Sequence, residues 1–166
     1  MAKLAKTAAI AAAALIAAAF PVYARTLEVG PGKPYGRPSE VAAAAGPGDR
    51  VVIAAGEYFD CAVWPQSNLV IEGDPSGGTV ITDKTCQGKA LFVIPGNDVT
   101  VRDLTLTRAR VPDDNGAGIR AEGRNLLIER VHFINNQDGV LANDHGSRVA
   151  PSLTMACPGR RDQPVP

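Results

Sequence analysis

Short segments in which apolar and polar residues alternate recur along the middle of the chain and align with one another. Asn68–Glu72 aligns with Asp98–Arg102 and with Asn125–Glu129, which gives a period of roughly 30 residues, within the range of known repeat architectures. The last two copies also align further on, because Asp103–Leu106 lies over Arg130–Phe133 at the same offset. Each period contains three strand-sized pieces separated by Gly, Asn and Asp. Periods of this length, built of short strands and tight corners, are typical of solenoids.

The alternation also predicts which side chains face the interior, because successive side chains of a strand point to opposite sides. On the outer side, Arg102 lies over Glu129 and Asp103 lies over Arg130, so that opposite charges are paired. The chain lacks the leucine and asparagine consensus of leucine-rich repeats, and its β-branched residues favour a parallel β-helix. The residues expected to stack inside are Val99, Val101, Leu104, Leu106, Leu126, Ile128, Val131 and Phe133.

The segment before the repeats predicts a short helix over residues 39–45. Pro38 and Ser39 stand at its start, alanines follow, and Gly46 stands just past its end. Pro47-Gly48-Asp49 then predicts a turn, and Val51–Ile53 a first strand.

Residues 1–24 have the pattern of a secretory signal peptide. Lys3 and Lys6 precede an uninterrupted apolar run from Ala8 to Phe20, and cleavage is expected after Ala24. The run is shorter than the roughly 20 residues that a membrane anchor needs, and no cysteine follows it for lipid attachment. We therefore predict an exported protein, periplasmic or extracellular, with no membrane anchor after cleavage.

The net charge of the chain becomes negative when the predicted signal peptide is left out. The whole chain is neutral, with 17 basic and 17 acidic residues. Residues 25–166 have 15 basic and 17 acidic side chains, a net charge of −2. Residues 25–144 have 12 basic and 16 acidic side chains, a net charge of −4. No basic block is present, so the composition argues against a nucleic-acid partner.

Three cysteines would lie in an oxidising compartment after export. The separation of Cys61 from Cys86 is close to one period, so they can lie on neighbouring rungs at a distance suited to a disulfide. Two buried free thiols are the alternative, and the pairing of Cys157 is open. No CxxC motif or Cys/His cluster with metal spacing is present, so no structural metal site is expected.

The stretch Ala45–Tyr58 resembles the opening of secreted right-handed parallel β-helix proteins of the pectin-lyase-like superfamily. It contains the end of the alanine-rich helix, Pro-Gly-Asp, a Val/Ile strand and Gly-Glu-Tyr in that order. The corners around Asn115-Gly116 and Asp138-Gly139 are similar to the repeats of its carbohydrate-binding and hydrolase members. The resemblance covers roughly residues 39–144. It implies an all-β, right-handed parallel β-helix of three to four rungs, in which the short N-terminal helix caps the first rung.

The pattern changes at the end of the chain. The best repeats span residues 69–142 and the expected β-helix domain residues 25–144, whereas residues 145–166 are rich in Pro, Arg and Gly without a strand pattern. We expect an irregular, disordered or frame-shifted tail on a truncated member of the superfamily. An uncapped last rung would expose strand edges, which predicts self-association.

Three residues are weak candidates for catalysis. Asp113 and Asp114 precede Asn115-Gly116 and could bind Ca²⁺, although a solvated turn is the preferred interpretation and no other cofactor is expected. His132 should point outward near Arg130, where it could act as a base or be ordinary strand surface.

The candidates for substrate binding are basic or aromatic. Arg108 and Arg110 flank Ala109 beside a loop and could hold an anionic sugar, although a solvated surface is the default for such charges. Trp64 and Tyr58 could stack on sugar rings, although the position of Trp64 at the end of a strand agrees equally well with its partial burial against the helix.

The motifs that mark pectate lyases, polygalacturonases and uronate epimerases are absent, so catalysis is not expected. The leading hypothesis is an exported, carbohydrate-interacting β-helix module with polysaccharide as its partner. The alternatives are the N-terminal part of a polysaccharide lyase or glycoside hydrolase, and a structural or adhesin-like surface protein.

Overall fold

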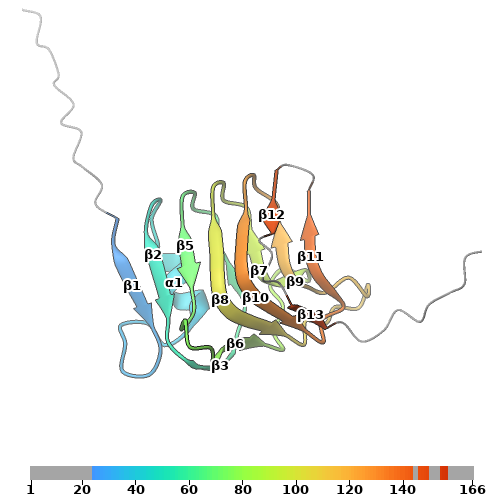
Figure 1. Cartoon of the computed structure of the whole chain (residues 1–166), viewed down its shortest axis with the longest axis horizontal. Helices are drawn as coiled ribbons and strands as arrows, with labels where there is room; N and C mark the ends of the chain where they lie inside the picture. The colour runs from blue at the N-terminus through green and yellow to red at the C-terminus, as the bar shows by residue number, and fades with distance from the viewer. Residues whose placement is uncertain (1–23, 144–145, 150–153, 157–166) are drawn as a thin grey trace, which may run out of the picture.

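The computed structural model describes residues 24–143, 146–149 and 154–156, which form a parallel β-helix of about five turns (Figure 1). The strand pairs between turns are parallel throughout the described residues, and each full turn contributes strands to three faces. The sequence predicts three to four rungs. The difference arises at the two ends, where strands pair although their sequences do not repeat.

Three stacked faces make up the coil. Face A contains β1 (Thr26–Val29), β2 (Arg50–Ile53), β5 (Val70–Glu72), the first halves of β8 (Thr100–Thr107) and β10 (Leu127–Ile134), and β12 (Arg148–Val149). Face B contains β3 (Gly56–Phe59), β6 (Thr79–Thr82), the second halves of β8 and β10, and β13 (Thr154–Ala156). Face C contains β4 (Ala62–Val63), β7 (Ala90–Ile94), β9 (Ala117–Ala121) and β11 (Asp138–Ala142).

The register predicted from the repeats is confirmed. Thr100 pairs with Val70 on one side and with Leu127 on the other, which are the partners expected from the three aligned segments. The predicted inward residues of both repeats are all buried and belong to one hydrophobic cluster that runs through the coil. Stacking the same apolar positions from turn to turn therefore builds the core.

Strands β8 and β10 each run through two faces and bend at a residue with positive φ. The bends lie at Asp103 (φ 58°) and Arg130 (φ 49°), which are neighbours in the register. Asp tolerates this left-handed conformation better than most residues, whereas Arg adopts it rarely. Arg130 is held there beside Asp103, to which its side chain donates two hydrogen bonds.

The corner before face A also repeats a positive φ, at Asn68 (60°), Asp98 (56°) and Asn125 (55°). The Asn125 amide donates to the Asp98 carboxylate at 2.9 Å, so neighbouring corners are joined through their side chains. These are the first residues of the three aligned segments, and short polar side chains suit this conformation.

Helix α1 (Pro38–Ala44) lies where a helix was predicted and packs on the first turns of the coil. Val41 and Ala42 are buried in the core, and the Gln66 side chain donates to the carbonyl of Ala42. The turn after the helix is tied down by Asp49, which accepts hydrogen bonds from the backbone N–H of Arg25 (3.0 Å) and of Gly46 (2.7 Å).

A disulfide joins Cys61 to Cys86, as predicted, with 5.5 Å between the Cα atoms. The two cysteines follow β3 and β6, which are paired strands of adjacent turns. The prediction from the period is therefore confirmed by the geometry of the turns.

The last described segments add strands where the sequence pattern indicated none. Strands β12 and β13 both pair with β10, so part of the segment after residue 144 continues the coil. The predicted signal segment up to residue 23, together with His145 and Cys157, lies outside the described residues. Within the described part of the chain, no helix is long and apolar enough to cross a membrane.

Candidate functional site

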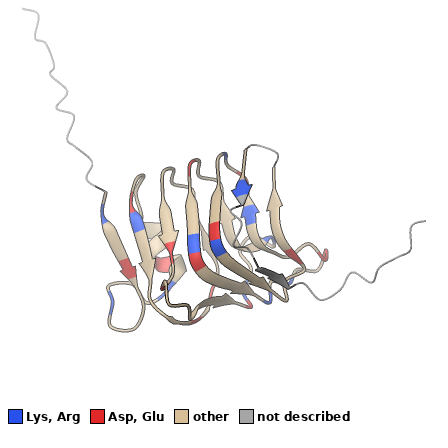
Figure 2. Ribbon diagram, viewed as in Figure 1, with Lys and Arg blue, Asp and Glu red and all other residues tan. Residues whose placement is uncertain are grey.

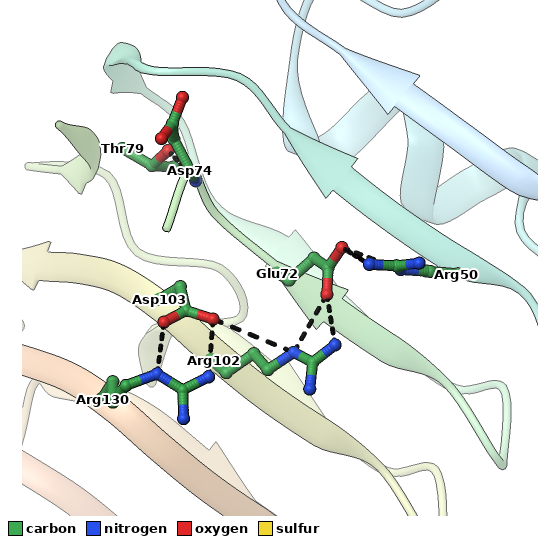
Figure 3. Close-up of polar contacts among 7 residues, drawn as sticks. All are labelled: Arg50, Glu72, Asp74, Thr79, Arg102, Asp103 and Arg130. Carbon is green, nitrogen blue, oxygen red and sulfur yellow. Dashed lines mark hydrogen bonds and ion pairs between the residues drawn. The ribbon is translucent and has the colours of Figure 1, made fainter. Parts of the chain in front are cut away.

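Five charged side chains form a continuous chain of ion pairs across the outer side of face A, here called the charged ladder. Figure 2 shows blue and red segments side by side on β2, β5, β8 and β10, and Figure 3 shows the contacts. The members, in spatial order, are Arg50, Glu72, Arg102, Asp103 and Arg130.

Glu72 is the centre of one half of the ladder. It is 7% exposed, and its carboxylate accepts from Arg50 Nε at 2.8 Å and from Arg102 Nη2 at 2.6 Å. Arg102 and Glu129 are register partners, as the repeats predict, but Arg102 forms its ion pair with Glu72 on the opposite neighbouring strand. A nearly buried carboxylate between two arginines is well compensated.

Asp103 is the centre of the other half. Its two oxygens accept from Arg130 Nε at 2.6 Å and from Arg130 Nη2 at 2.8 Å, which confirms the predicted pairing of these residues. The hydrogen bonds from Arg130 hold the pKa of Asp103 below its ordinary value and raise the pKa of Arg130. Asp103 is therefore a fixed anion rather than a proton donor.

A pocket of about 330 Å³ opens beside this end of the ladder. Three successive turns supply its walls, namely the loop from Asp74 to Thr79, the bend of β8 and the bend of β10. The residues that line it are Asp74, Pro75, Ser76, Gly77, Gly78, Thr79, Asp103, Leu104, Thr105, Arg130 and His132. We call it the bend pocket.

The loop that forms one wall is held by local hydrogen bonds. The backbone N–H of Asp74 donates to Thr79 Oγ1 at 2.9 Å, and the hydroxyl of Ser76 donates to the Asp74 carboxylate at 2.6 Å. The hydrogen bonds from Ser76 lower the pKa of Asp74. In Figure 3 the Asp74 carboxylate points away from Asp103, so the two acids do not form a facing pair.

His132 is exposed on the outer side of β10 and lines the bend pocket with its register partner Thr105. Strand alternation predicts that His132 points outward near Arg130, and both residues line this pocket. It is the one catalytic candidate from the sequence that the structure brings to the bend pocket. The loop residues of the pocket were missed, because the segment from Asp74 to Gly78 lies outside the repeat pattern.

Asp113 and Asp114 lie elsewhere, in an exposed turn before β9. Asp114 accepts a hydrogen bond from Gln137 Nε2 at 2.9 Å, which ties the turn to the next coil. Across the described residues, no group of three or more His, Cys, Asp or Glu side chains is placed to hold a metal ion.

The two arginine candidates are both engaged in structural contacts. Arg108 donates to Asp83 at 2.6 Å and to Glu57 at 2.9 Å, and these hydrogen bonds raise its pKa. Arg110 donates to the backbone oxygen of Asn135 at 2.6 Å and to its side-chain oxygen at 2.7 Å. Neither guanidinium lines the bend pocket.

The aromatic candidates are buried, so neither can stack on a sugar at the surface. Trp64 is 0% exposed and packs edge-on against Phe92, with ring centroids 5.6 Å apart. Tyr58 is 6% exposed and donates to the carbonyl of Ala54. The structure instead exposes Phe59, which is not among the candidates predicted from the sequence. Alternation in β3 places it on the side opposite to buried Tyr58.

Solved structures of pectin methylesterases have a similar coil. The chain aligns with pectin methylesterase from Aspergillus niger at a TM-score of 0.66 and 11% identity, over 78% of this chain and 49% of that chain. The fold is a right-handed parallel β-helix of the pectin-lyase-like type. This confirms the fold that the resemblance implied.

Two other pectin methylesterase structures align with this right-handed β-helix. PemA from Erwinia chrysanthemi gives a TM-score of 0.54 at 16% identity, over 69% of this chain and 45% of that chain. A pectin methylesterase mutant in complex with a hexasaccharide gives 0.52 at 17% identity, over 64% and 42%. The chain thus spans less than half the length of these proteins. No protein-family model and no curated protein sequence matches it.

Proposed function

We propose that this right-handed β-helix is an exported module that binds a polysaccharide at the bend pocket and does not itself catalyse a reaction. The observation that carries the proposal is the bend pocket, in which three successive turns present polar side chains around a concave surface. Pockets of this size with a few convergent polar groups are the usual binding sites for small ligands. The export prediction and the disulfide are consistent with an extracellular ligand.

The lining has the donors and acceptors that sugar hydroxyls require. Arg130 and His132 offer N–H donors, whereas the carboxylates of Asp74 and Asp103 are acceptors. Pro75 and Leu104 add an apolar surface for the C–H groups of a sugar ring. Because the Asp103–Arg130 pair is already formed, binding would not require these charges to reorganise.

The ionised state of the two carboxylates supports binding of a sugar rather than cleavage of a glycosidic bond. Hydrolysis of a glycosidic bond needs one carboxylic acid with a raised pKa that protonates the leaving group. The pKa values of Asp74 and Asp103 are both lowered, by Ser76 and Arg130 respectively. The two acids of the bend pocket would both be ionised near neutral pH.

Isothermal titration calorimetry with a galacturonate hexasaccharide tests the proposal, because the similar solved structures are pectin methylesterases, one of them bound to a hexasaccharide. We expect saturable binding that His132→Ala weakens about tenfold. Asp113→Asn, which changes a predicted site residue outside the bend pocket, should bind like the unmodified chain. Absence of binding to this ligand, to alginate oligomers and to neutral glucans would contradict the proposal and favour a structural or adhesin-like role.

The alternative is that the chain forms part of a carbohydrate-active enzyme, and the likeness to pectin methylesterases favours testing it. The assay measures methanol released from methyl-esterified pectin, together with reducing ends and unsaturated products from pectate, alginate and neutral glucans. Turnover that Asp103→Asn abolishes would replace the binding proposal with an enzymatic one.

A further inference from the structure

Phe59 is the most exposed large hydrophobic residue that the structure describes, with 69% of its surface accessible. It ends β3 on the outer side of face B, where its register partners in the following turns are Thr82, Thr107 and Ile134. Ile134, at 42%, is the other exposed large hydrophobic residue of the described chain. Three rungs of ~4.8 Å separate the two, or about 14 Å.

The surroundings of Phe59 suit a small polar ligand better than a protein partner. Thr82 and Thr107, which lie between Phe59 and Ile134, are 1% and 7% exposed and present little apolar surface. The area of one ring is far below the roughly 800 Å² per partner of a stable protein interface. An isolated exposed aromatic ring can stack on the apolar face of a sugar ring while polar neighbours contact its hydroxyls.

A network of charges lies near Phe59 in the register of face B. Glu57, which precedes Phe59 on the same side of β3, accepts from Arg108 Nη2 at 2.9 Å. The same guanidinium donates to Asp83 through Nε at 2.9 Å and Nη2 at 2.6 Å. The hydrogen bonds from Arg108 lower the pKa of Asp83, so both carboxylate and guanidinium are charged and held in place. Fixed charged groups beside a ring can hydrogen-bond the hydroxyls of a sugar stacked on it.

A row of outward positions leads from this network to the bend pocket. Glu57, Val80, Thr105 and His132 are successive register partners across face B. Thr105 and His132 both line the bend pocket. Phe59 and His132 are three rungs and two strand positions apart, a distance of about 16 Å from the spacings of a β-sheet.

We infer that Phe59 is the stacking platform of a second sugar subsite, and that the ligand is an oligosaccharide lying across face B from the bend pocket to Phe59. This inference rests on the proposed function and adds to it a minimum ligand length. A disaccharide would occupy the bend pocket alone, whereas a hexasaccharide would contact both subsites.

The test compares calorimetric titrations of a galacturonate disaccharide and a hexasaccharide on the whole chain. Phe59→Ala should weaken binding of the hexasaccharide about tenfold, or ~1.4 kcal/mol, and leave binding of the disaccharide unchanged. Phe59→Tyr keeps an aromatic ring and should retain the affinity. Ile134→Ala removes the other exposed hydrophobic residue and is the matched control, expected to bind like the unmodified chain.

The outcomes separate this inference from the proposed function. If Phe59→Ala binds the hexasaccharide normally while His132→Ala does not, the second subsite is refuted and the bend pocket stands. If neither the unmodified chain nor any variant binds either sugar, the proposed function fails and this inference fails with it. If sedimentation shows oligomers of the unmodified chain that Phe59→Ala dissociates, Phe59 is a contact between copies and the inference is overturned.

Discussion

Replacing Asp49 with Asn should destabilise the first turn in a way that depends on pH. Asp49 is 1% exposed and accepts hydrogen bonds from the backbone N–H of Arg25, from the Arg25 guanidinium at 2.6 Å and from the backbone N–H of Gly46. Arg25 also donates to the carbonyl of Ala44 at the end of α1. Asp49 therefore joins the start of β1, the helix and the turn before β2.

The magnitude follows from the pKa of this carboxyl. Hydrogen bonds, led by those from the Arg25 side chain, lower the pKa of Asp49 from 3.8 to about 2. One unit corresponds to ~1.36 kcal/mol, so the ionised carboxylate contributes about 2 kcal/mol to the free energy of unfolding. Since the pKa is lower in the folded state, this contribution is complete well above pH 4. It should fall to about half by pH 3 and vanish below about pH 2.

Urea unfolding of the unmodified chain and of Asp49→Asn at a series of pH values measures this contribution. We expect a difference of about 2 kcal/mol at pH 7 that shrinks steadily below pH 4. Glu28→Gln removes the exposed ion pair with Lys33 and is the control, with an expected effect below about 0.5 kcal/mol. A difference for Asp49→Asn that is the same at pH 7 and pH 3 would refute the reasoning.

Three further substitutions test the coil itself by denaturant unfolding. Cys61→Ser opens the disulfide, whose partners are 25 residues apart, and should cost about 3.5 kcal/mol by loop entropy, so a variant as stable as the oxidised chain would contradict that role. Gly123→Ala would place a Cβ 2.0 Å from the carbonyl oxygen of Gly96 and should unfold much more readily than Gly36→Ala, whose Cβ has room. Asn136→Ala should lower the free energy of unfolding by about 1–3 kcal/mol, because the fully buried amide accepts a hydrogen bond from the Ala109 N–H and donates one to the carbonyl of Leu106. An unchanged denaturation midpoint of Asn136→Ala would show that water replaces the amide.

The central turns could be predicted from the sequence because their length is nearly constant. Along face A, Val70 pairs with Thr100 and Thr100 with Leu127 at similar separations in the sequence, so equivalent residues align by inspection. At the ends the turns are shorter, since Arg50 pairs with Val70 and Leu127 with Arg148 across clearly fewer residues. Loops of different length hide the repeat there, and the number of turns was underestimated.

The candidate site was harder to predict than the fold. Strand alternation placed His132 on the outer side near Arg130, and the pairing of Asp103 with Arg130 followed from the alignment of the last two repeats. The loop from Asp74 to Gly78 follows no period, so nothing in its sequence indicated that it would face the two bends. Trp64 is buried because it packs against Phe92 from the next turn. The length of its own strand does not predict this contact.

The hydrogen bond between Arg25 and Asp49 gives the predicted cleavage after Ala24 a chemical consequence. The backbone nitrogen of Arg25 lies 3.0 Å from Asp49 Oδ1. Cleavage at that bond would convert an amide nitrogen into an ammonium group, positively charged below about pH 8, directly against a buried carboxylate. A charged donor makes a stronger hydrogen bond than a neutral one. If the predicted cleavage occurs, the new ammonium group would strengthen the contact with Asp49. A chain that starts at Arg25 should then unfold at a higher denaturant concentration than one that retains Ala24.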